Sequence, residues 1–453
     1  MDGNSHWNPR HETMPRRQLE ALQLAKLRNA VGWALESPGL QGALLREAGV
    51  VPEDLTSLAD VRRIPFLTRD AWMEAQLAAP PFGDILAAPP DVAVRHHLTS
   101  GTTGRQPIRV LDGLKDWEWI AEMWCYAFWG FGVRPSDRVF LAFGYGSFIG
   151  FWGAHYACEK IGCLVLPGGN MTTETRLRHL LDTGATVLCS TPTYALRLAQ
   201  EARRLGIDLA AGPVRRVVLS GEPAGSIPAT KRLIEAEWGA RTADTAGMTE
   251  LGTIMTFECE AQPGGTHIIE DNFLEEVVDP SSGEPVPYGR MGERVVTSFG
   301  RGIIPLLRYR TRDLVVRTPG GHCPCGRTWD LYDGGIQGRV DDMLLVRGTN
   351  VYPRALEAVV REYPEVDEFQ IHLYTEEGIR EEIEVLVETP GRPGTGGRLA
   401  GELAKSLAEA AGGLRIGVRE APPGSLPRFE LKARRVRDER IVIGSGETRE
   451  AAE

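Results

Sequence analysis

ATVLCSTPTYALRLAQEARRLG, residues 185–206, is an apolar run of strand length followed by a segment with helical spacing that closes on a glycine. Three similar apolar runs, each leading into a glycine turn, lie nearby: DRVFLAF (137–143), CLVLPGG (163–169) and RRVVLSGEP (215–223). Strands that alternate with helices in this way predict a largely parallel sheet covered by helices. Ligands of such sheets bind beyond the carboxyl ends of the strands, so the turns after these runs form the candidate site.

The pattern changes twice further along the chain. From about residue 265 strands and turns dominate, which predicts a β-rich subdomain over about 265–337, and GRVDDMLLVRGTNVYP (338–353) indicates a boundary. Beyond the boundary, helices and alternating strands predict a small α+β domain. We therefore expect an α/β protein with mostly parallel sheets in its large domain and a small mobile C-terminal domain. Its expected parts are a mobile N-terminus (1–18), the large domain (19–337), the small domain (338–440) and a tail (441–453).

Charge and hydropathy exclude several classes of function. The 453-residue chain carries 51 Lys and Arg against 61 Asp and Glu, a net charge of −10. This balance disfavours nonspecific binding to nucleic acid or to an anionic membrane as the main activity. The chain has no run of about 18 apolar residues that would span a membrane. MDGNSHWNPRHETMPRR (1–17) lacks the apolar centre of a signal peptide, so we expect a cytoplasmic protein.

LTSGTTG (98–104) is rich in glycines and hydroxyls. Glycine lets the backbone approach a ligand closely, and the Ser and Thr hydroxyls add donors beside exposed N–H groups. Such a loop can wrap an anionic oxygen without a fixed positive charge. No Gly-Lys-Ser/Thr follows, so the loop is not of the Walker type. A solvated linker of the same composition is the alternative.

Further segments follow this loop in order along the chain: GEP (221–223), DTAGMTE (244–250), RYRTRD (308–313), GRVDDM (338–343) and LPRFELK (426–432). With them the chain resembles the adenylate-forming superfamily, which includes acyl-CoA synthetases, peptide-synthetase adenylation domains and luciferase. The resemblance is strongest to the phenylacetate–CoA ligase-like branch and runs from about residue 60 to about residue 440. It implies an AMP-forming acid–thiol ligase that uses ATP, Mg²⁺ and coenzyme A.

The same resemblance implies roles for individual residues. Thr249 would contact the α-phosphate of ATP, Glu250 would hold Mg²⁺, and Lys432 would act in adenylation. Asp341 would be the pivot about which the small domain rotates. The remaining implied contacts to ATP are the phosphate-loop residues Thr99, Ser100, Gly101, Thr102, Thr103 and Gly104, the adenine turn Gly221, Glu222 and Pro223, and Asp244, Ala246, Asp313 and Arg339.

The implied reaction joins a carboxylic acid to AMP and then passes the acyl group to coenzyme A. Transfer to a carrier protein or an amine in trans is one alternative. A homologue that binds a ligand without turnover is another, and three departures from the family pattern support it: Ala246 replaces Tyr, and Arg312 and Leu431 replace Gly. The sequence leaves the oligomeric state open, although homodimers are common in the branch that it resembles.

FGYGSFIGFW (143–152) interleaves aromatic residues with glycines, a pattern typical of a flat apolar slot. Such a slot suits an aryl or arylacetic acid better than a long acyl chain, although plain core packing is the alternative. His155 follows the slot, and the resemblance implies a gate beside the substrate carboxylate there; a core histidine is the alternative. The residues assigned to the slot are Phe143, Tyr145, Phe148 and Phe151, joined by Gly247.

Three cysteines and one histidine have the residue types of a structural zinc site. Cys323 and Cys325 form a Cys-x-Cys pair, Cys259 follows the DTAGMTE segment, and His267 lies eight positions after Cys259. Together they would make a closed tetrahedral Cys₃His set. His322 can take the place of His267, and unmetallated thiols are the alternative.

Overall fold

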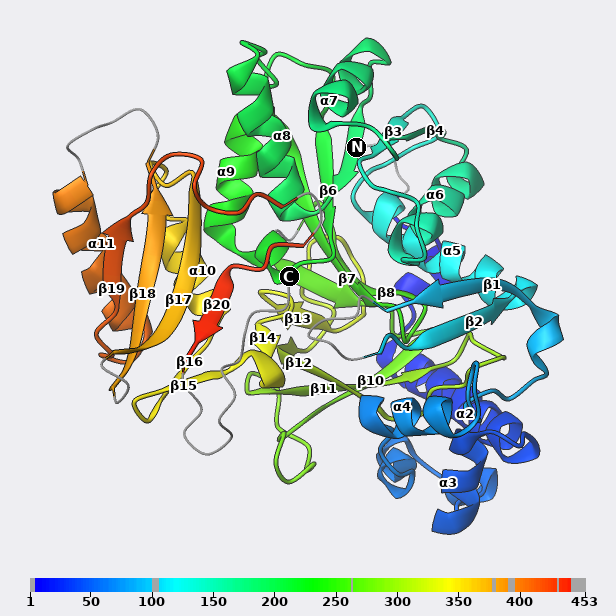
Figure 1. Ribbon diagram of the computed structural model, residues 1–453. Coiled ribbons are helices and arrows are strands. Elements are labelled where there is room, and N and C mark those ends of the chain that lie inside the picture. Colours follow the sequence, from blue (N-terminus) through cyan, green and yellow to red (C-terminus); the bar gives the residue numbers. More distant parts are fainter. Residues whose placement is uncertain are drawn as a thin grey trace.

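A computed structural model of the protein describes residues 5–99, 106–261, 264–376, 380–389, 396–429 and 432–440. One twelve-stranded sheet forms the centre of the large domain, in the order β10-β11-β12-β13-β9-β8-β7-β6-β5-β3-β4 with β14 paired to β12 (Figure 1). Neighbouring strands of one half run parallel, as the sequence predicted. They are β3 (Arg138–Leu141), β4 (Leu164–Pro167), β5 (Val187–Ser190), β6 (Arg216–Ser220) and β7 (Arg241–Met248).

Alternation along the parallel strands divides the core into two layers. Val139 and Val187 face one hydrophobic cluster, whereas their neighbours Phe140 and Leu188 face the other. The first layer is covered by α5 (Leu114–Gly130) and α6 (Gly150–Ile161). The second layer is covered by α7 (Thr173–Asp182), α8 (Pro192–Arg204) and α9 (Pro228–Trp238). Both faces are therefore buried, which is why the strands read as continuous apolar runs.

The predicted β-rich subdomain is present, and its strands continue the same sheet. The chain turns back after β7, which pairs antiparallel with β8, and β8 then pairs antiparallel with β9. The strands of this half are β8 (Thr253–Glu258), β9 (Gly265–Ile268), β10 (Phe273–Val278), β11 (Met291–Ser298), β12 (Tyr309–Thr318), β13 (Leu331–Asp333) and β14 (Gly338–Arg339).

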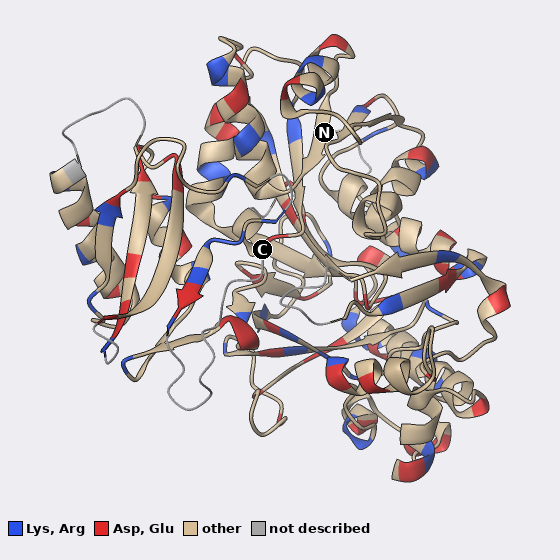
Figure 2. Ribbon diagram, viewed as in Figure 1, with Lys and Arg blue, Asp and Glu red and all other residues tan. Residues whose placement is uncertain are grey.

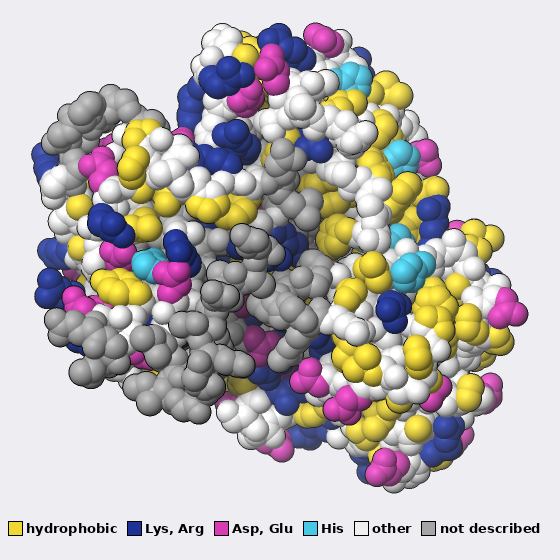
Figure 3. Space-filling view, in the orientation of Figure 1, with side chains coloured by type: hydrophobic (Ala, Val, Ile, Leu, Met, Phe, Trp, Pro, Cys, Tyr) yellow, Lys and Arg dark blue, Asp and Glu magenta, His cyan; other side chains and the backbone are white. Residues whose placement is uncertain are grey.

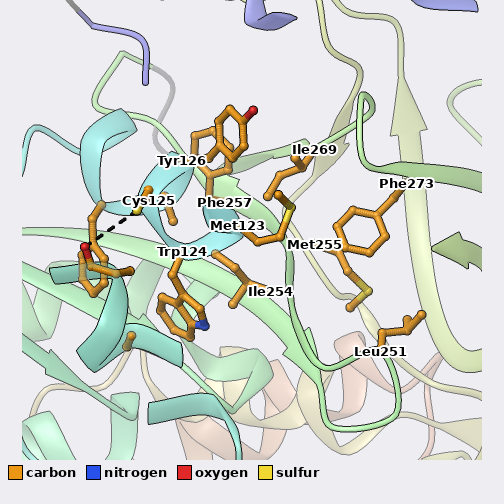
Figure 4. Close-up of a cluster of buried hydrophobic side chains, with 14 of the residues drawn as sticks. Met123, Trp124, Cys125, Tyr126, Leu251, Ile254, Met255, Phe257, Ile269 and Phe273 are labelled. Atoms are coloured by element: carbon orange, nitrogen blue, oxygen red, sulfur yellow. Dashed lines mark hydrogen bonds between the residues drawn. The ribbon is translucent and has the colours of Figure 1, made fainter. Parts of the chain in front are cut away.

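α5 packs directly on β8 in the largest core cluster. In Figure 4, Met123, Trp124 and Tyr126 from α5 lie against Ile254 and Phe257 from β8. The last residue of the helix is Gly130, and a Cβ there would come within 2.5 Å of the Phe257 ring. The helix can approach the strand this closely only because that position has no side chain.

The N-terminal part differs from the mobile segment expected over residues 1–18. Residues 5–18, which include α1 (Pro9–Glu12), pack against the large domain. Glu12 is fully buried, and its carboxylate accepts a hydrogen bond from Arg327 Nε at 2.6 Å. His11 Nδ1 lies 2.7 Å from Asp271 Oδ2. The polar composition suggested mobility, but these polar groups find their partners about 260 to 315 positions away.

Three more helices and a hairpin complete the large domain. They are α2 (Arg16–Glu36), α3 (Leu40–Ala48), α4 (Arg69–Ala78), and the antiparallel pair β1 (Ala93–Leu98) and β2 (Arg109–Gly113), with short 3₁₀ turns η1 (Pro52–Asp54), η2 (Leu58–Arg63), η3 (Pro90–Val92) and η4 (Pro223–Ser226).

The small domain is α+β, as predicted, and has its own hydrophobic core. After η5 (Val340–Asp342), a hairpin of β15 (Leu344–Val346) and β16 (Thr349–Val351) leads into it. Its sheet has the order β19-β18-β17-β20. These strands are β17 (Glu368–Glu376), β18 (Arg380–Glu388), β19 (Gly417–Glu420) and β20 (Val436–Glu439), accompanied by α10 (Pro353–Val360) and α11 (Gly396–Ala410).

The two domains touch through polar contacts beside α8 and α9. Arg232 Nη2 lies 2.7 Å from Glu362 Oε2, and Gln200 Nε2 donates to Asp367 Oδ1 at 3.0 Å. Within the described residues, no helix has both the length and the apolar character to cross a membrane. Acidic and basic side chains are interspersed along the ribbon and over the visible face (Figures 2 and 3).

Candidate active site

The predicted phosphate loop joins β1 to β2. Thr99 holds the base of the loop in both directions: its N–H donates to the Ile108 carbonyl at 3.1 Å, and its Oγ1 accepts from Ile108 N at 2.9 Å. The loop is therefore anchored on the hairpin. The other residues assigned to it, Ser100, Gly101, Thr102, Thr103 and Gly104, lie outside the described residues.

The predicted adenine turn follows β6, at the carboxyl end of the parallel strands. Gly221 has φ +95°, a conformation that favours glycine, and it reverses the chain before Glu222 and Pro223. Glu222 accepts a hydrogen bond from Thr193 N in the first turn of α8 at 3.1 Å. Burial raises the pKa of Glu222, and the nearby Arg435 opposes that shift.

The next strand, β7, carries Asp244 and Ala246 on one face. Asp244 is 3% exposed, and its Oδ1 has no hydrogen-bond partner among the described residues. Burial, together with the neighbouring Glu258, raises its pKa well above the ordinary value. Ala246 packs beside a cluster that contains Ile336 and Tyr332. A buried carboxyl with one oxygen unpartnered among the described residues, beside the turn after β6, is compatible with the predicted nucleotide contact.

Gly247 lies near the end of β7, opposite Ile254 of β8, and Thr249 and Glu250 lie in the turn that joins the two strands. A Cβ at Gly247 would meet the Thr253 carbonyl oxygen at 2.5 Å, so only glycine fits there. Thr249 and Glu250 are buried. Burial raises the pKa of Glu250, and its own backbone N–H together with the nearby Arg69 and Arg339 opposes that shift. A buried carboxylate is the kind of oxygen ligand that suits Mg²⁺.

A buried ion pair that sequence reasoning missed supports this turn. Arg301 Nη1 donates to the Glu250 carbonyl at 2.6 Å, and Arg301 Nη2 lies 2.6 Å from Asp112 Oδ1; both side chains of the pair are fully buried. Asp112 lies on β2, so the pair connects the hairpin under the phosphate loop with the Glu250 turn. Asp112 and Arg301 are 189 positions apart, and neither belongs to a recognisable motif.

Asp313 and Arg339 meet at the predicted ribose position. Asp313 lies on β12 and Arg339 on β14, and these strands pair at that point. Arg339 Nη1 lies 3.4 Å from Asp313 Oδ1. Burial raises the pKa of Asp313, and Arg339 opposes the shift. The structure therefore brings these two predicted residues together beside the hinge.

The predicted pivot, Asp341, pairs with one of the residues that depart from the family pattern. Arg312 has φ +64°, which explains why a glycine is usual at that position. Its Nε and Nη2 donate to Asp341 Oδ1 at 3.1 and 2.8 Å. The ion pair thus offsets part of the cost of the left-handed backbone.

Arg312→Gly is expected to change the free energy of unfolding by less than about 1 kcal/mol. The variant loses a partly exposed ion pair worth about 0–1 kcal/mol but is released from a left-handed conformation that costs about 1–2 kcal/mol. Urea unfolding of both proteins measures the difference. A loss above about 2 kcal/mol would contradict this reading of the backbone.

Lys432 reaches the large domain from the small domain. A Cβ on Gly221 would lie 3.7 Å from Lys432 Cε, and Lys432 Nζ lies 5.6 Å from the centre of the Phe148 ring. Although the side chain keeps access to solvent, the surrounding protein desolvates the ammonium and lowers its pKa. Glu222 and Glu250 oppose that shift, which indicates that Lys432 lies in the field of the predicted site.

The aromatic residues of the predicted slot, residues 143–152, differ in how deeply they are buried. Tyr145 and Phe148 are partly buried, whereas Phe143 and Phe151 are 1% and 2% exposed and pack within the main core. Their direct contact with a substrate stays a prediction. His155 on α6 lies 3.0 Å through Nδ1 from Tyr145 Oη and 3.2 Å through Nε2 from Glu159 Oε1. Its role as a gate likewise stays a prediction.

The predicted zinc ligands come together from three segments: Cys259 directly follows β8, His267 lies on β9, and Cys323 and Cys325 lie between β12 and β13. One atom each from Cys259, His267, Cys323 and Cys325 lies within 4.8 Å of the other three. The Cys259 and Cys323 sulfurs are 3.6 Å apart, and Cys325 Sγ lies 3.3 Å from His267 Nε2. A tetrahedral site with Zn–S distances of about 2.3 Å requires sulfurs roughly 3.8 Å apart. His322 is exposed and does not join this cluster.

Comparison with known proteins identifies the family. Residues 46–301 match the family model of the AMP-binding enzymes, and residues 348–440 match that of the AMP-binding enzyme C-terminal domain. The chain therefore belongs to the AMP-binding enzyme family. It is 37% identical over 383 residues to the phenylacetate-coenzyme A ligase of Thermus thermophilus, covering 84% of each chain, and belongs to the phenylacetate–CoA ligase-like branch.

Two solved structures of a 2-hydroxyisobutyryl-CoA ligase, in different states, can be compared with the arrangement of the two domains in this chain. In its postadenylation state it superposes with a TM-score of 0.90 at 30% identity, covering 96% of this chain and 93% of the other. In its thioesterification state the TM-score is 0.73 at 31% identity, with coverage of 97% and 94%. Identity and coverage are nearly the same, so the difference lies in how the parts are arranged. The arrangement of the domains in this chain is more similar to that in the postadenylation structure than to that in the thioesterification structure.

Proposed function

We propose that this enzyme activates an aromatic carboxylic acid, of the aryl or arylacetic class, with ATP to an acyl adenylate and transfers the acyl group to coenzyme A. The products are the thioester, AMP and pyrophosphate. The observation that carries the proposal is the position of Lys432, which extends from the small domain to the turn after β6 and lies in the field of Glu250 and Asp313. The phenylacetate–CoA ligase relatives support the substrate class.

The proposed residues act by positioning and by stabilising charge. A free carboxylate is a weak acyl donor because its leaving group would be oxide. Attack of the carboxylate on the α-phosphorus expels pyrophosphate and leaves AMP as the better leaving group. Lys432 offsets the negative charge that grows on the phosphorus oxygens, and Thr249 donates its hydroxyl to the α-phosphate. Glu250 would hold Mg²⁺, which neutralises phosphate charge when bound.

The aromatic segment supports the choice of an aromatic acid. Phe148 lies under the Lys432 ammonium, and the Tyr145 and Trp152 rings meet edge to face with centres 4.9 Å apart. A planar ring packs well against such surfaces. A cytoplasmic location and a homodimer stay predictions from the sequence.

We also propose that Cys259, His267, Cys323 and Cys325 hold a structural zinc ion. The four donors form a closed set, which leaves no open position for catalysis. Three thiolates and one Zn²⁺ carry a net negative charge, and the fully buried Arg327 lies in the electrostatic field of Cys325 and Cys259. Arg327 also binds Glu12 and the Ser5 carbonyl, so the site would help to dock the N-terminal segment.

Pyrophosphate release by the whole protein with ATP and Mg²⁺ tests the proposed reaction. The panel contains aryl, arylacetic and short 2-hydroxy acids, each with and without coenzyme A. We expect release that depends on an aromatic acid and a thioester when coenzyme A is present. Release of pyrophosphate without a thioester would contradict coenzyme A as the acyl acceptor and favour a carrier protein or an amine. No release with any acid would contradict adenylation and favour a ligand-binding homologue.

The rate of adenylation is expected to fall at alkaline pH, at a midpoint below the ordinary lysine pKa of about 10.4. Lys432 acts as a cation, and burial lowers its pKa; Arg339 lowers it further, whereas Glu222, Glu250 and Asp313 raise it. The active form is therefore present below the lowered pKa and is lost as the pH rises through it. Acid-dependent pyrophosphate release measured from pH 7 to pH 10 checks this, and a profile flat to pH 10 would contradict it.

A further inference from the structure

Glu222 joins the two domains at the residue next to Lys432. One carboxylate oxygen, Oε2, accepts from Thr193 N on α8 at 3.1 Å; the other, Oε1, accepts from Ala433 N at 2.5 Å. The first contact is internal to the large domain, and the second crosses to the small domain. In Figure 1 the red segment that precedes β20 extends from the small domain towards the large domain.

The turn that carries Glu222 is also the surface against which Lys432 lies. Gly221 has no side chain, and a Cβ there would be 3.7 Å from Lys432 Cε. The backbone of Ala433 is therefore fixed to Glu222 while the preceding side chain passes over Gly221. The turn at Gly221 and Glu222 therefore fixes the backbone next to Lys432 and also contacts the Lys432 side chain.

The contact requires a carboxylate rather than any polar group. Both oxygens accept from N–H donors, whereas an amide offers one oxygen and would place its NH₂ against the other N–H. The donor on α8 lies in the first helical turn, where negative charge is favoured. Arg435 is engaged elsewhere, at 2.9 Å from Glu368 and 3.3 Å from Glu357, so it does not occupy the acceptors of Glu222.

We propose that Glu222 is a positioning residue that holds Lys432 in place for adenylation and releases it when the small domain rotates. This inference rests on the proposed function. The hydrogen bond to Ala433 belongs to the postadenylation arrangement of the domains, and rotation about the Asp341 hinge would break it. Glu222 then acts through Lys432 on the first half-reaction only, whereas any contact between its turn and adenine would serve both half-reactions alike.

Separate assays of the two half-reactions test this role. Glu222→Ala and Glu222→Gln should lower acid-dependent adenylation about 10- to 100-fold, the effect expected for a lost charge-assisted hydrogen bond. Because Glu222 also belongs to the predicted adenine turn, thioester formation from coenzyme A and a saturating concentration of acyl adenylate should fall much less than adenylation. Arg232→Ala is the matched control, because it breaks an exposed ion pair of the same domain interface (Arg232 60% and Glu362 57% exposed) and should change either rate less than about 5-fold.

A double-mutant cycle shows whether Glu222 acts through Lys432. Glu222→Gln should cost nothing further in a Lys432→Ala background, because the group that it positions is gone. Additive losses, or equal losses in both half-reactions, would overturn the proposal. Thermal melting of each variant identifies a folding defect, and Glu222→Gln keeps the size of the side chain if the alanine variant fails to fold.

An activity-free measurement separates this inference from the proposed reaction. Acetic anhydride followed by peptide mass spectrometry reports how readily Lys432 is labelled. Labelling of Lys432 should be several-fold faster in Glu222→Gln than in the unmodified protein, whereas labelling of the exposed Lys405 should not change. Equal labelling of Lys432 would overturn the inference whatever the substrate is. A wild-type protein without pyrophosphate release would contradict only the proposed reaction.

Discussion

Lys432→Ala is expected to lower the rate of adenylation by about 100- to 1000-fold, the loss measured when one donor to a developing oxyanion is removed. The ammonium lies over the turn after β6, where charge would grow on the α-phosphate. Acid-dependent pyrophosphate release measures the effect. Because we expect the small domain to rotate Lys432 away before the second half-reaction, thioester formation from supplied acyl adenylate should remain within a few-fold of the wild-type rate.

Lys405→Ala is the matched control for this experiment. Lys405 is an exposed lysine on α11 of the same domain, so its removal makes the same change of net charge away from the site. Neither half-reaction should respond to it. A loss of less than about 3-fold in Lys432→Ala would remove Lys432 from the adenylation step, and a parallel loss of thioester formation would indicate a general defect of the small domain.

Loss of the proposed zinc ion is expected to be the largest effect on stability. The protein should contain about one zinc per chain, and Cys323→Ser and Cys325→Ser should lose it. Removing a structural metal belongs to the class of changes that cost more than about 4 kcal/mol, which corresponds to a fall in Tm of roughly 10 °C for a domain of this size. Metal analysis and thermal melting of the same samples check both expectations.

Cys163→Ser is the matched control for the zinc experiment. Its Sγ donates to the Arg134 carbonyl at 3.2 Å, outside the cluster, and a serine hydroxyl can make the same contact. We expect full zinc content and a small change in Tm. Less than about 0.2 zinc per chain in carefully reduced wild-type protein would contradict the metal site and leave four unmetallated side chains.

Much of the fold follows from local patterns. The apolar runs that became β3, β4, β5 and β6 predicted parallel strands because strands buried on both faces read as continuous apolar sequence. The zinc candidates were found from residue type alone, since few other roles bring three cysteines and a histidine into one buried cluster. The sequence also showed that Arg312 stands where the family usually has glycine. It did not show why glycine is usual there, which is that the backbone at this position is left-handed.

The N-terminal segment and the β-rich half show where local patterns fail. Residues 5–18 are polar and have no apolar face of their own, yet Glu12 is buried because Arg327 supplies its counter-charge. The β-rich subdomain was predicted, but its continuity with the parallel sheet was not, because nothing in the alternation of its strands shows that β8 will pair with β7. Both features depend on partners that are distant in sequence.

The amino-acid sequence by itself determined the order of the domains, the parallel strands and the residue types of the site, since periodicity, glycine turns and ligand chemistry are local properties. Only the tertiary structure decided which of these groups act on one another. Glu222 and Ala433 are 211 positions apart, and Asp112 and Arg301 are 189 apart. Contacts over such separations form because the packed sheet and the docked small domain exclude water and impose partners, and no local pattern encodes that choice.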